Sequence, residues 1–191
     1  MRADARANQQ KILTTANRLF AEQGVANVGM KQLAHEAHIG VGTLYRNYPS
    51  KGALCVALIR DRMQHYVDQA NAYLDTTTDR PEKQLTVILQ GYLDVRVAHE
   101  GFFTIIENET TPLGFTQLLQ TPIYRNRIDL LIRFLRRNQP ASSEQYLCFQ
   151  ADMVAAMLRS RVYAFERHQR HLSNQDLLHA ILRLLTGKTQ Q

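Results

Sequence analysis

Residues 30–54, MKQLAHEAHIGVGTLYRNYPSKGAL, are the stretch of this 191-residue chain that decides its fold. Apolar residues recur there at helical spacing and predict two short helices, over about 30–37 and 41–48. A tight connection, residues 38–40, joins them, and Pro49 stops the second helix because proline cannot continue it. Two short helices joined by a tight turn are typical of a helix-turn-helix.

The second of these helices has two chemically different sides. On a helical wheel Val41, Leu44 and Tyr48 lie within about 60° of one another, so we expect them to face the interior. The opposite side carries small and polar residues, namely Gly42, Thr43, Arg46 and Asn47, with Tyr45 on the flank. In the major groove of DNA, arginine recognises guanine, asparagine recognises adenine, and threonine bonds bases or phosphates. This side therefore predicts DNA contact, although the polar residues of a short surface helix can also simply meet water.

Three runs in this stretch resemble the N-terminal signature of TetR-type bacterial regulators. They are Leu33-Ala34-x-x-Ala37, Gly42-Thr43-Leu44-Tyr45 and Tyr48-Pro49-Ser50-Lys51, and the resemblance covers roughly residues 8–58. It implies that the second short helix is a recognition helix in the major groove, where Thr43, Tyr45 and Arg46 touch bases or phosphates. It also implies that Lys51 meets the DNA backbone, and that the protein is a ligand-responsive repressor that binds a palindromic operator as a homodimer.

The residues that we expect to bind DNA are Lys31, Gly40, Gly42, Thr43, Tyr45, Arg46, Asn47, Tyr48 and Lys51. The ammonium of Lys51 and the free N–H groups at the start of the following helix suit an anion. Gly29 and Gly40 depart from the family pattern, which often has threonine or serine at these positions before the two short helices. Without those hydroxyls, phosphate contacts there would rest on backbone N–H groups, and glycine still caps a helix adequately.

The chain as a whole has the pattern of an all-α, TetR-like protein. Glycine and proline fall at segment ends, and no stretch keeps strand-like alternation for long. We expect a three-helix DNA-binding domain over residues 1–51 and a helical ligand-binding and dimerisation domain over residues 52–191. The helices, about nine in number, are expected over residues 3–23, 30–37, 41–48, 51–74, 81–99, 102–109, a stretch that reaches 138, 142–168 and 173–187.

Several helix ends have recognisable signals. Gly24 is placed to cap the end of the first helix, and Ser50 can cap the start of the fourth. Pro122 suits a first helical turn, and the run 173–176, SNQD, resembles a capping box with Asp in the position of Glu. Polar or proline-containing breaks are expected at Asp75–Asp79, Thr110–Gly114 and Asn138–Pro140.

Positive charge is concentrated towards the N-terminus. Residues 1–51 hold seven lysines and arginines against three acidic residues, in a chain whose net charge is +6. A basic end on a nearly neutral body favours a polyanionic partner. The polar N-terminus lacks the apolar core of a signal peptide, so we expect a cytoplasmic protein with no membrane contact. We expect Cys55 and Cys148 to be buried, reduced thiols.

The resemblance further implies a pocket in the body for a small-molecule inducer. Aromatic and methionine side chains with a few polar groups suit such a pocket. The candidates are Met63, Tyr66, Tyr92, Arg96, His99, Phe102, Phe103, Ile106, Phe149, Met153 and Met157. Methionine and aromatic residues at helical spacing are also typical of an ordinary core, which stays open as an alternative for each of them.

The last two predicted helices favour a dimer. Residues 146–158 are nearly apolar all round, and a helix that is apolar on every side is buried on every side. One side of this pair can pack on the body while the other meets a second copy, as the resemblance to the family also implies. The residues expected at the interface are Val154, Leu158, Leu177, Leu178, Ile181 and Leu185. A purely internal core is the alternative.

No P-loop, dinucleotide fingerprint, nucleophile elbow or zinc motif occurs, so we expect neither an enzyme nor a cofactor. His99, Glu100 and Glu107 raise the hypothesis of a metal site. Adjacent helical residues point about 100° apart, and Glu107 lies beyond a predicted break, so we expect no metal there. An all-helical hydrolase with dispersed catalytic residues and a helical scaffold without a DNA role stay open. Salt-sensitive, sequence-selective DNA binding would distinguish a regulator from both.

Overall fold

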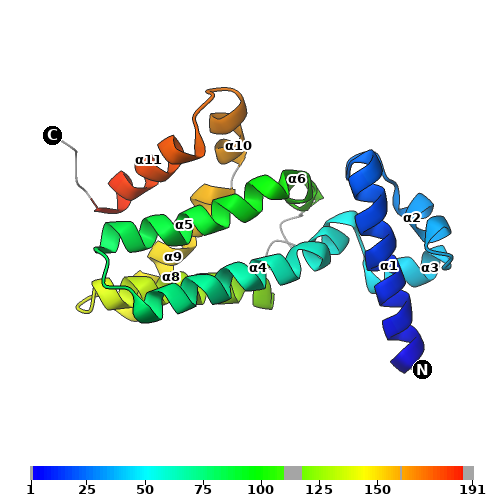
Figure 1. The fold of residues 1–191 in the computed structure, drawn as a ribbon, viewed down its shortest axis with the longest axis horizontal. Coiled ribbons are helices and arrows are strands. Elements are labelled where there is room, and N and C mark those ends of the chain that lie inside the picture. The colour runs from blue at the N-terminus through cyan, green and yellow to red at the C-terminus, as the bar shows by residue number, and fades with distance from the viewer. Residues whose placement is uncertain (1, 110–117, 160, 187–191) are drawn as a thin grey trace. The chain divides into compact units, whose positions relative to one another are not determined.

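The computed structural model describes residues 2–109, 118–159 and 161–186, and all regular secondary structure in these ranges is helical (Figure 1). The ten described helices are α1 (Arg2–Gln23), α2 (Met30–Glu36), α3 (Val41–Asn47), α4 (Lys51–Thr76), α5 (Pro81–Ala98), α6 (Glu100–Glu109), α8 (Pro122–Asn138), α9 (Glu144–Arg159), α10 (Arg161–His168) and α11 (Asn174–Thr186). The prediction of an all-α protein is confirmed. The segment 142–168, expected as one helix, contains both α9 and α10. The expected break at Thr110–Gly114 and the helix end near Gly187 lie outside the described residues.

The ends of three helices follow from their sequence signals, as predicted. Gly24 ends α1 with a φ of 81°, a left-handed conformation that glycine adopts without steric penalty. The Ser50 hydroxyl accepts a hydrogen bond from the N–H of Ala53 at 3.1 Å and so caps the start of α4. At the start of α11, the Asp176 carboxylate accepts from the N–H of Ser173 at 2.8 Å, and the Ser173 hydroxyl accepts from the N–H of Asp176 at 3.1 Å. These reciprocal bonds are a capping box.

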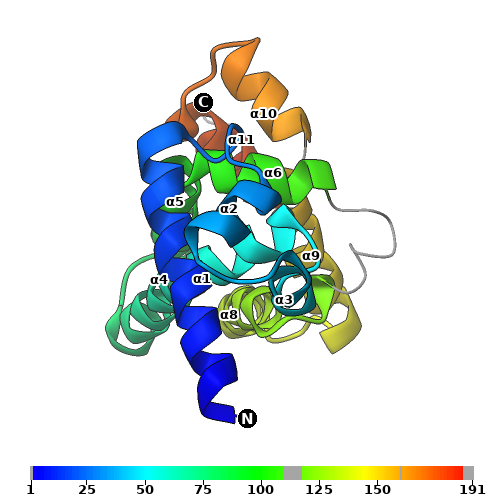
Figure 2. The same ribbon diagram turned by 90° about the vertical axis from the view of Figure 1, so that its right-hand side faces the viewer.

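The chain forms two compact units, and the first consists of Met1–Asp61 and Ala98–Gln117. Its described helices are α1, α2, α3, the start of α4, and α6. Helix α2 packs against both α1 and α3 (Figure 2). Phe20 of α1 meets Phe102 of α6 edge to face, with ring centroids 5.8 Å apart. Apolar side chains from all these helices make the core, which includes Ile12, Ala16, Leu19, Val28, Leu33, Ala34, Leu44, Leu54, Cys55 and Phe103.

The second unit consists of Arg62–Val97 and Leu118–Gln191. It holds the rest of α4, most of α5, and α8 to α11, with α8 packed along α9 and α9 against α10. Its core includes Met63, Leu74, Ile88, Leu89, Tyr92, Leu93, Leu130, Leu147, Ala151 and Val154. Within the described ranges, none of the helices combines the length and the apolar character that crossing a membrane requires.

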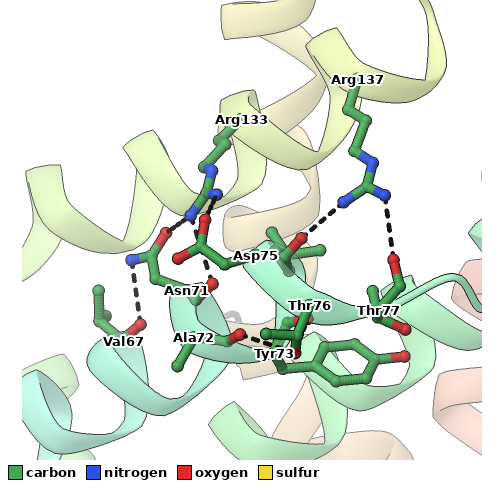
Figure 3. A network of polar contacts seen from close by, with 10 residues as sticks. Val67, Asn71, Ala72, Tyr73, Asp75, Thr76, Thr77, Arg133 and Arg137 are labelled. Atoms are coloured by element: carbon green, nitrogen blue, oxygen red, sulfur yellow. Dashed lines mark hydrogen bonds and ion pairs between the residues drawn. The ribbon is translucent and has the colours of Figure 1, made fainter.

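Two arginines of α8 hold the C-terminal end of α4 (Figure 3). Arg133 donates to Oδ1 of Asn71 at 2.7 Å and forms an ion pair with Asp75. Arg137 donates to the carbonyl oxygen of Leu74 at 2.6 Å. A cation beside the last carbonyls of a helix satisfies acceptors that have no partner within that helix, and it complements the helix dipole. These contacts fix α4 beside α8, and both helices contribute to the cavity described below.

Candidate nucleic-acid interface and cavity

Helix α3 is anchored by its apolar side. Leu44 is fully buried and Tyr48, which follows the helix, is 5% exposed. The turn before α3 is tight because His38 takes a φ of 53° and the N–H of Ile39 bonds a carbonyl of α2 at 3.0 Å. Val41 is 40% exposed, so the prediction that it faces the interior is wrong. As the first residue of α3, it projects back towards the helix N-terminus, where the core ends.

The other side of α3 presents polar groups. Gly42, Tyr45, Arg46 and Asn47 are exposed, and Thr43 is half-buried. Arg46 donates to the Thr43 hydroxyl at 3.0 Å, and Asn47 donates to the Thr43 carbonyl at 2.8 Å. Both bonds are local to the helix, so the guanidinium and the amide can exchange them for other partners without a change of fold. A Cβ on Gly42 would meet no atom within 4 Å, so near the start of α3 this side has a position without a side chain.

The start of α4 is engaged by the chain itself. The Lys51 ammonium donates to the carbonyl oxygens of Val25 and Ala26, at 2.8 and 3.2 Å. The N–H of Gly52 donates to a carboxylate oxygen of Glu109, the last residue of α6, at 2.6 Å. The donors that we expected to be free for an anion therefore have intramolecular acceptors in this structure.

The same carboxylate acts on a cysteine. Burial first, and then the nearby charge of Glu109, raise the pKa of the Cys55 thiol to about 12. At neutral pH this thiol keeps its proton, and a protonated thiol is a poor nucleophile. Both cysteines are free; Cys55 is fully buried, as expected, but Cys148 is only half-buried. Cys148 lies where the exposed and buried sides of α9 meet.

The remaining predicted DNA-binding residues have different surroundings. Lys31 and Gly40 are exposed. Gly29 and Gly40 are the N-cap residues of α2 and α3, and neither helix has a side-chain cap. The Tyr48 ring lies in the core of the first unit, and its hydroxyl is buried without a hydrogen-bond partner among the described residues. Tyr48 therefore supports α3 from inside.

The second unit contains a small cavity with room for about one water molecule. Helices α4, α5, α8 and α9 supply its lining, which is Tyr66, Leu89, Tyr92, Arg127, Leu131, Ala155 and Leu158. Tyr66 donates its hydroxyl to the carbonyl of Ile88 at 3.0 Å, which fixes the ring at the wall. Two of the predicted ligand-binding residues, Tyr66 and Tyr92, line this cavity.

The other predicted ligand-binding residues lie elsewhere. Four of them belong to the first unit, namely His99, Phe102, Phe103 and Ile106. Two are buried in the second unit outside this lining, namely Met63 and Arg96. On α9, Phe149 and Met153 are 57% and 43% exposed, and Met157 is half-buried. The structure does not gather the predicted set around this cavity.

Arg127 was not among the predicted ligand-binding residues, yet it is the charged group of the cavity lining. It is 7% exposed, and its guanidinium carbon lies 4.7 Å from the ring centroid of Tyr92 and 5.1 Å from that of Tyr124. Its Nε–H is buried and donates to no acceptor within the described chain. The signal in the sequence is its place four residues before Leu131, on the apolar side of an amphipathic helix, where a charge is not expected.

The residues predicted at a dimer interface are mostly buried within a single chain. Those that are at most 8% exposed are Val154, Leu158, Leu177, Leu178 and Ile181, and Leu185 is half-buried. Helix α9 exposes its other side instead. Tyr146, Phe149 and Met153 are 51%, 57% and 43% exposed, and their spacing of three and four residues places them on one face.

Comparison with known sequences identifies relatives over the whole chain. The sequence profile described as bacterial regulatory proteins, tetR family, matches residues 12–58. An HTH-type transcriptional regulator of Staphylococcus aureus strain USA300 is 30% identical over 173 residues, which cover 91% of this chain and 89% of that protein. A protein described in the same words, from strain MSSA476, is 27% identical over 191 residues, which cover 100% of this chain and 99% of that protein.

Solved structures share the fold. FadR of Thermus thermophilus, a TetR family transcriptional repressor in complex with lauroyl-CoA, gives a TM-score of 0.76 at 17% identity and covers 95% of each chain. FadR of Bacillus subtilis, in complex with stearoyl-CoA, gives a TM-score of 0.66 at 13% identity, over 95% of this chain and 100% of that one. At such low identities the likeness is one of fold.

Proposed function

Since the chain belongs to the TetR family and is therefore a DNA-binding transcriptional regulator, not an enzyme, we propose that it is a ligand-responsive repressor that binds a palindromic operator as a homodimer. In this proposal residues 1–51 bind DNA, and residues 52–191 bind the ligand and dimerise. The observation that carries it is the polar side of α3, where Arg46 and Asn47 are exposed on a helix that the buried Leu44 holds in place.

Recognition of the operator rests on α3 in the major groove. Arg46 pairs with guanine through two hydrogen bonds, and Asn47 pairs with adenine in the same manner. Thr43 and Tyr45 touch neighbouring bases or phosphates. The bare position at Gly42 lets the helix backbone approach the base edges closely, because no side chain separates the two there.

Phosphate contacts orient α3 without distinguishing sequences. Lys31 is exposed one residue inside α2, and the first N–H groups of α2 and α3 have no side-chain cap at Gly29 or Gly40. Lys51 contributes by exchanging a carbonyl partner for a phosphate oxygen. The excess of positive charge in residues 1–51 supports this arrangement, because it attracts DNA of any sequence.

The exposed apolar side of α9 supports a homodimer. Large exposed apolar side chains occur on α9 and on the two helices after it: Tyr146, Phe149, Met153, Val162, Phe165 and Leu184. Exposed apolar side chains that share a face, as Tyr146, Phe149 and Met153 do on α9, are typical of an interface, and a second copy can cover them through a two-fold axis. Two-fold symmetry also matches a palindromic operator. The proposed interface thus keeps the predicted helices but uses the side of α9 opposite Val154 and Leu158.

The cavity in the second unit supports binding of a small molecule. An apolar lining with few polar groups is typical of ligand sites. The two FadR structures contain acyl-CoA, which supports an effector with an apolar part. A ligand that binds one arrangement of the dimer better than another shifts the population between them, and so changes the affinity for DNA.

Fluorescence anisotropy tests the DNA-binding part of the proposal. We expect a duplex selected from random-sequence DNA to bind at least about a thousandfold more tightly than a scrambled duplex, with a steep dependence on salt. Equal affinity for both duplexes would contradict an operator-binding function. Sedimentation at micromolar concentration tests the dimer, whose mass should be twice 21.9 kDa, and a clean monomer would contradict it.

A further inference from the structure

Arg127 is a buried cation to which the described chain supplies no anionic partner. It is 7% exposed, its Nε has no hydrogen-bond partner, and no carboxylate of the described residues forms an ion pair with it. Arginine does not lose its charge at any ordinary pH. A buried charge is strongly unfavourable unless an opposite charge and hydrogen bonds compensate it. An anion beside Arg127 would therefore be strongly stabilised.

The neighbours of Arg127 do not take the place of such an anion. The faces of Tyr92 and Tyr124 attract the guanidinium, but an aromatic face is a weaker partner than a carboxylate. Tyr124 donates its hydroxyl to Asp152 at 2.9 Å. Burial and that carboxylate raise the pKa of Tyr124 to about 12, so the phenol keeps its proton and its bond to Asp152. Asp152 is thus already occupied by a different donor.

The cavity beside Arg127 defines what kind of anion fits. Leu89, Leu131 and Leu158 make its wall apolar, and the Tyr66 hydroxyl is directed to a backbone carbonyl. A carboxylate matches the planar guanidinium with two parallel hydrogen bonds, while an alkyl chain matches the leucines. We propose that this cavity binds a hydrophobic monocarboxylate whose carboxylate pairs with Arg127. This inference rests on the proposed function, because it names the chemical class of the effector.

The size of the cavity gives the ligand a mechanical consequence. Room for about one water molecule does not admit an alkyl chain, so binding has to move the lining side chains apart. That lining comes from four helices, α4, α5, α8 and α9. A bound monocarboxylate therefore acts on the spacing of all four, including α9, whose other side carries the proposed dimer contact.

Calorimetric titration of the wild-type dimer with octanoate and with octanamide tests the charge requirement directly. Octanamide has the same chain and nearly the same shape, but it carries no charge. We expect octanoate to bind at least tenfold more tightly, because a hydrogen bond to a charged group is stronger than one between neutral groups. Equal affinity, or no binding of octanoate at millimolar concentration, would overturn the inference.

Two arginine variants of the same helix locate the anion. Arg127→Gln should abolish the preference for octanoate, whereas Arg125→Gln, at an exposed position two residues away, should keep it. Circular dichroism establishes that each variant is folded. Unchanged octanoate binding in folded Arg127→Gln would overturn the assignment. Arg127→Lys retains the charge but not the paired N–H donors of the guanidinium, so it should keep part of the preference for octanoate over octanamide.

A third measurement separates this inference from the proposed function. Octanoate is added to the complex of the wild-type protein with its selected duplex, and anisotropy follows release of DNA. If octanoate binds through Arg127 without changing DNA affinity, the anion site stands and the ligand-responsive part of the proposed function fails. If a different small molecule releases DNA while octanoate does not bind, the proposed function stands and the anion site fails.

Discussion

Helices α3 and α9 each bury one side within their own unit, but the chemistry of their exposed sides differs. The exposed side of α3 carries Arg46 and Asn47, whereas that of α9 carries Phe149 and Met153. A charged and amide-bearing side stays hydrated until a partner with matching donors and acceptors replaces the water, as base edges do. An apolar side gains free energy wherever it leaves water. Amphipathic spacing is common to both helices, so the chemistry of the exposed side is what separates a DNA-binding helix from a protein-binding one.

The largest expected effect tests the assignment of buried and exposed sides. Leu178 of α11 is 2% exposed, so Leu178→Glu places an unpaired charge in the core of the second unit and should lower the free energy of unfolding by about 4 kcal/mol or more. Gln175→Glu, at an exposed position of the same helix outside the proposed interface, should stay within about 0.5 kcal/mol of the wild type. Urea unfolding followed by circular dichroism measures both. If the Leu178→Glu protein were folded but monomeric, the original prediction that Leu178 lies at the dimer interface would be supported instead.

The next effect tests the exposed side of α9. Phe149→Glu should leave each subunit folded but weaken the dimer by about 2 kcal/mol or more, because a buried aromatic anchor of an interface is replaced by a charge. Gln69→Glu adds the same charge at an exposed position of α4 and should leave the dimer unchanged. Sedimentation over a range of concentrations measures the dissociation constant. If both variants dimerise like the wild type, the apolar side of α9 has another partner.

A comparable or smaller effect tests the exposed side of α3. Arg46→Ala should cost about 1–3 kcal/mol on the selected duplex and relax the preference at one base position in each half-site. Lys31→Ala should weaken binding to all sequences alike and make the log–log salt slope shallower by about one unit per subunit. Anisotropy at several salt concentrations distinguishes the two. Lys51→Ala is a less direct probe, because it also removes the bonds to Val25 and Ala26.

The smallest effect concerns the carboxylate at the start of α4. Glu109 accepts a bond from the N–H of Gly52, where we propose that Lys51 meets a phosphate, so its negative charge opposes DNA. Glu109→Gln should tighten binding to specific and scrambled duplexes alike by about 0.3–1 kcal/mol at low salt, and less at high salt. Glu107→Gln, two residues earlier on the same helix, serves as the comparison. Weaker DNA binding by Glu109→Gln would show that the carboxylate supports the interface rather than opposing it.

The sequence allowed the region around α3 to be predicted because each local signal had a single solution. The family signature, the tight turn and the stop at Pro49 all agreed, and Leu44 and Tyr48 are buried as the wheel requires. The capping box of Ser173 and Asp176 was equally direct, since both partners lie within one turn. The prediction for Val41 was wrong because a helical wheel takes no account of where a helix begins. Val41 is the first residue of α3, and the core beneath the helix ends there.

The second unit could not be predicted at the same level, because its signals depend on partners far away in the sequence. Leu177 and Ile181 form an apolar stripe, but the stripe does not say whether its partner is another helix of the chain or a second copy. Phe149 and Met153 are of residue types that are typical of a ligand pocket, but they lie at the surface. Arg127 is visible in the sequence as a charge on an apolar side, but its significance depends on the absence of a nearby carboxylate, which only the fold defines.

Glycine at position 42 bears on how the operator preference of such a regulator can evolve. A glycine inside a helix is about 1 kcal/mol less favourable than alanine, and a Cβ here would meet nothing, so the fold itself gains nothing from glycine at this position. A single codon change can therefore add a side chain to the proposed DNA-facing side, near the start of α3, while the subunit stays folded. After a gene duplication, one copy could acquire a different operator preference through this codon and leave the original regulatory circuit intact.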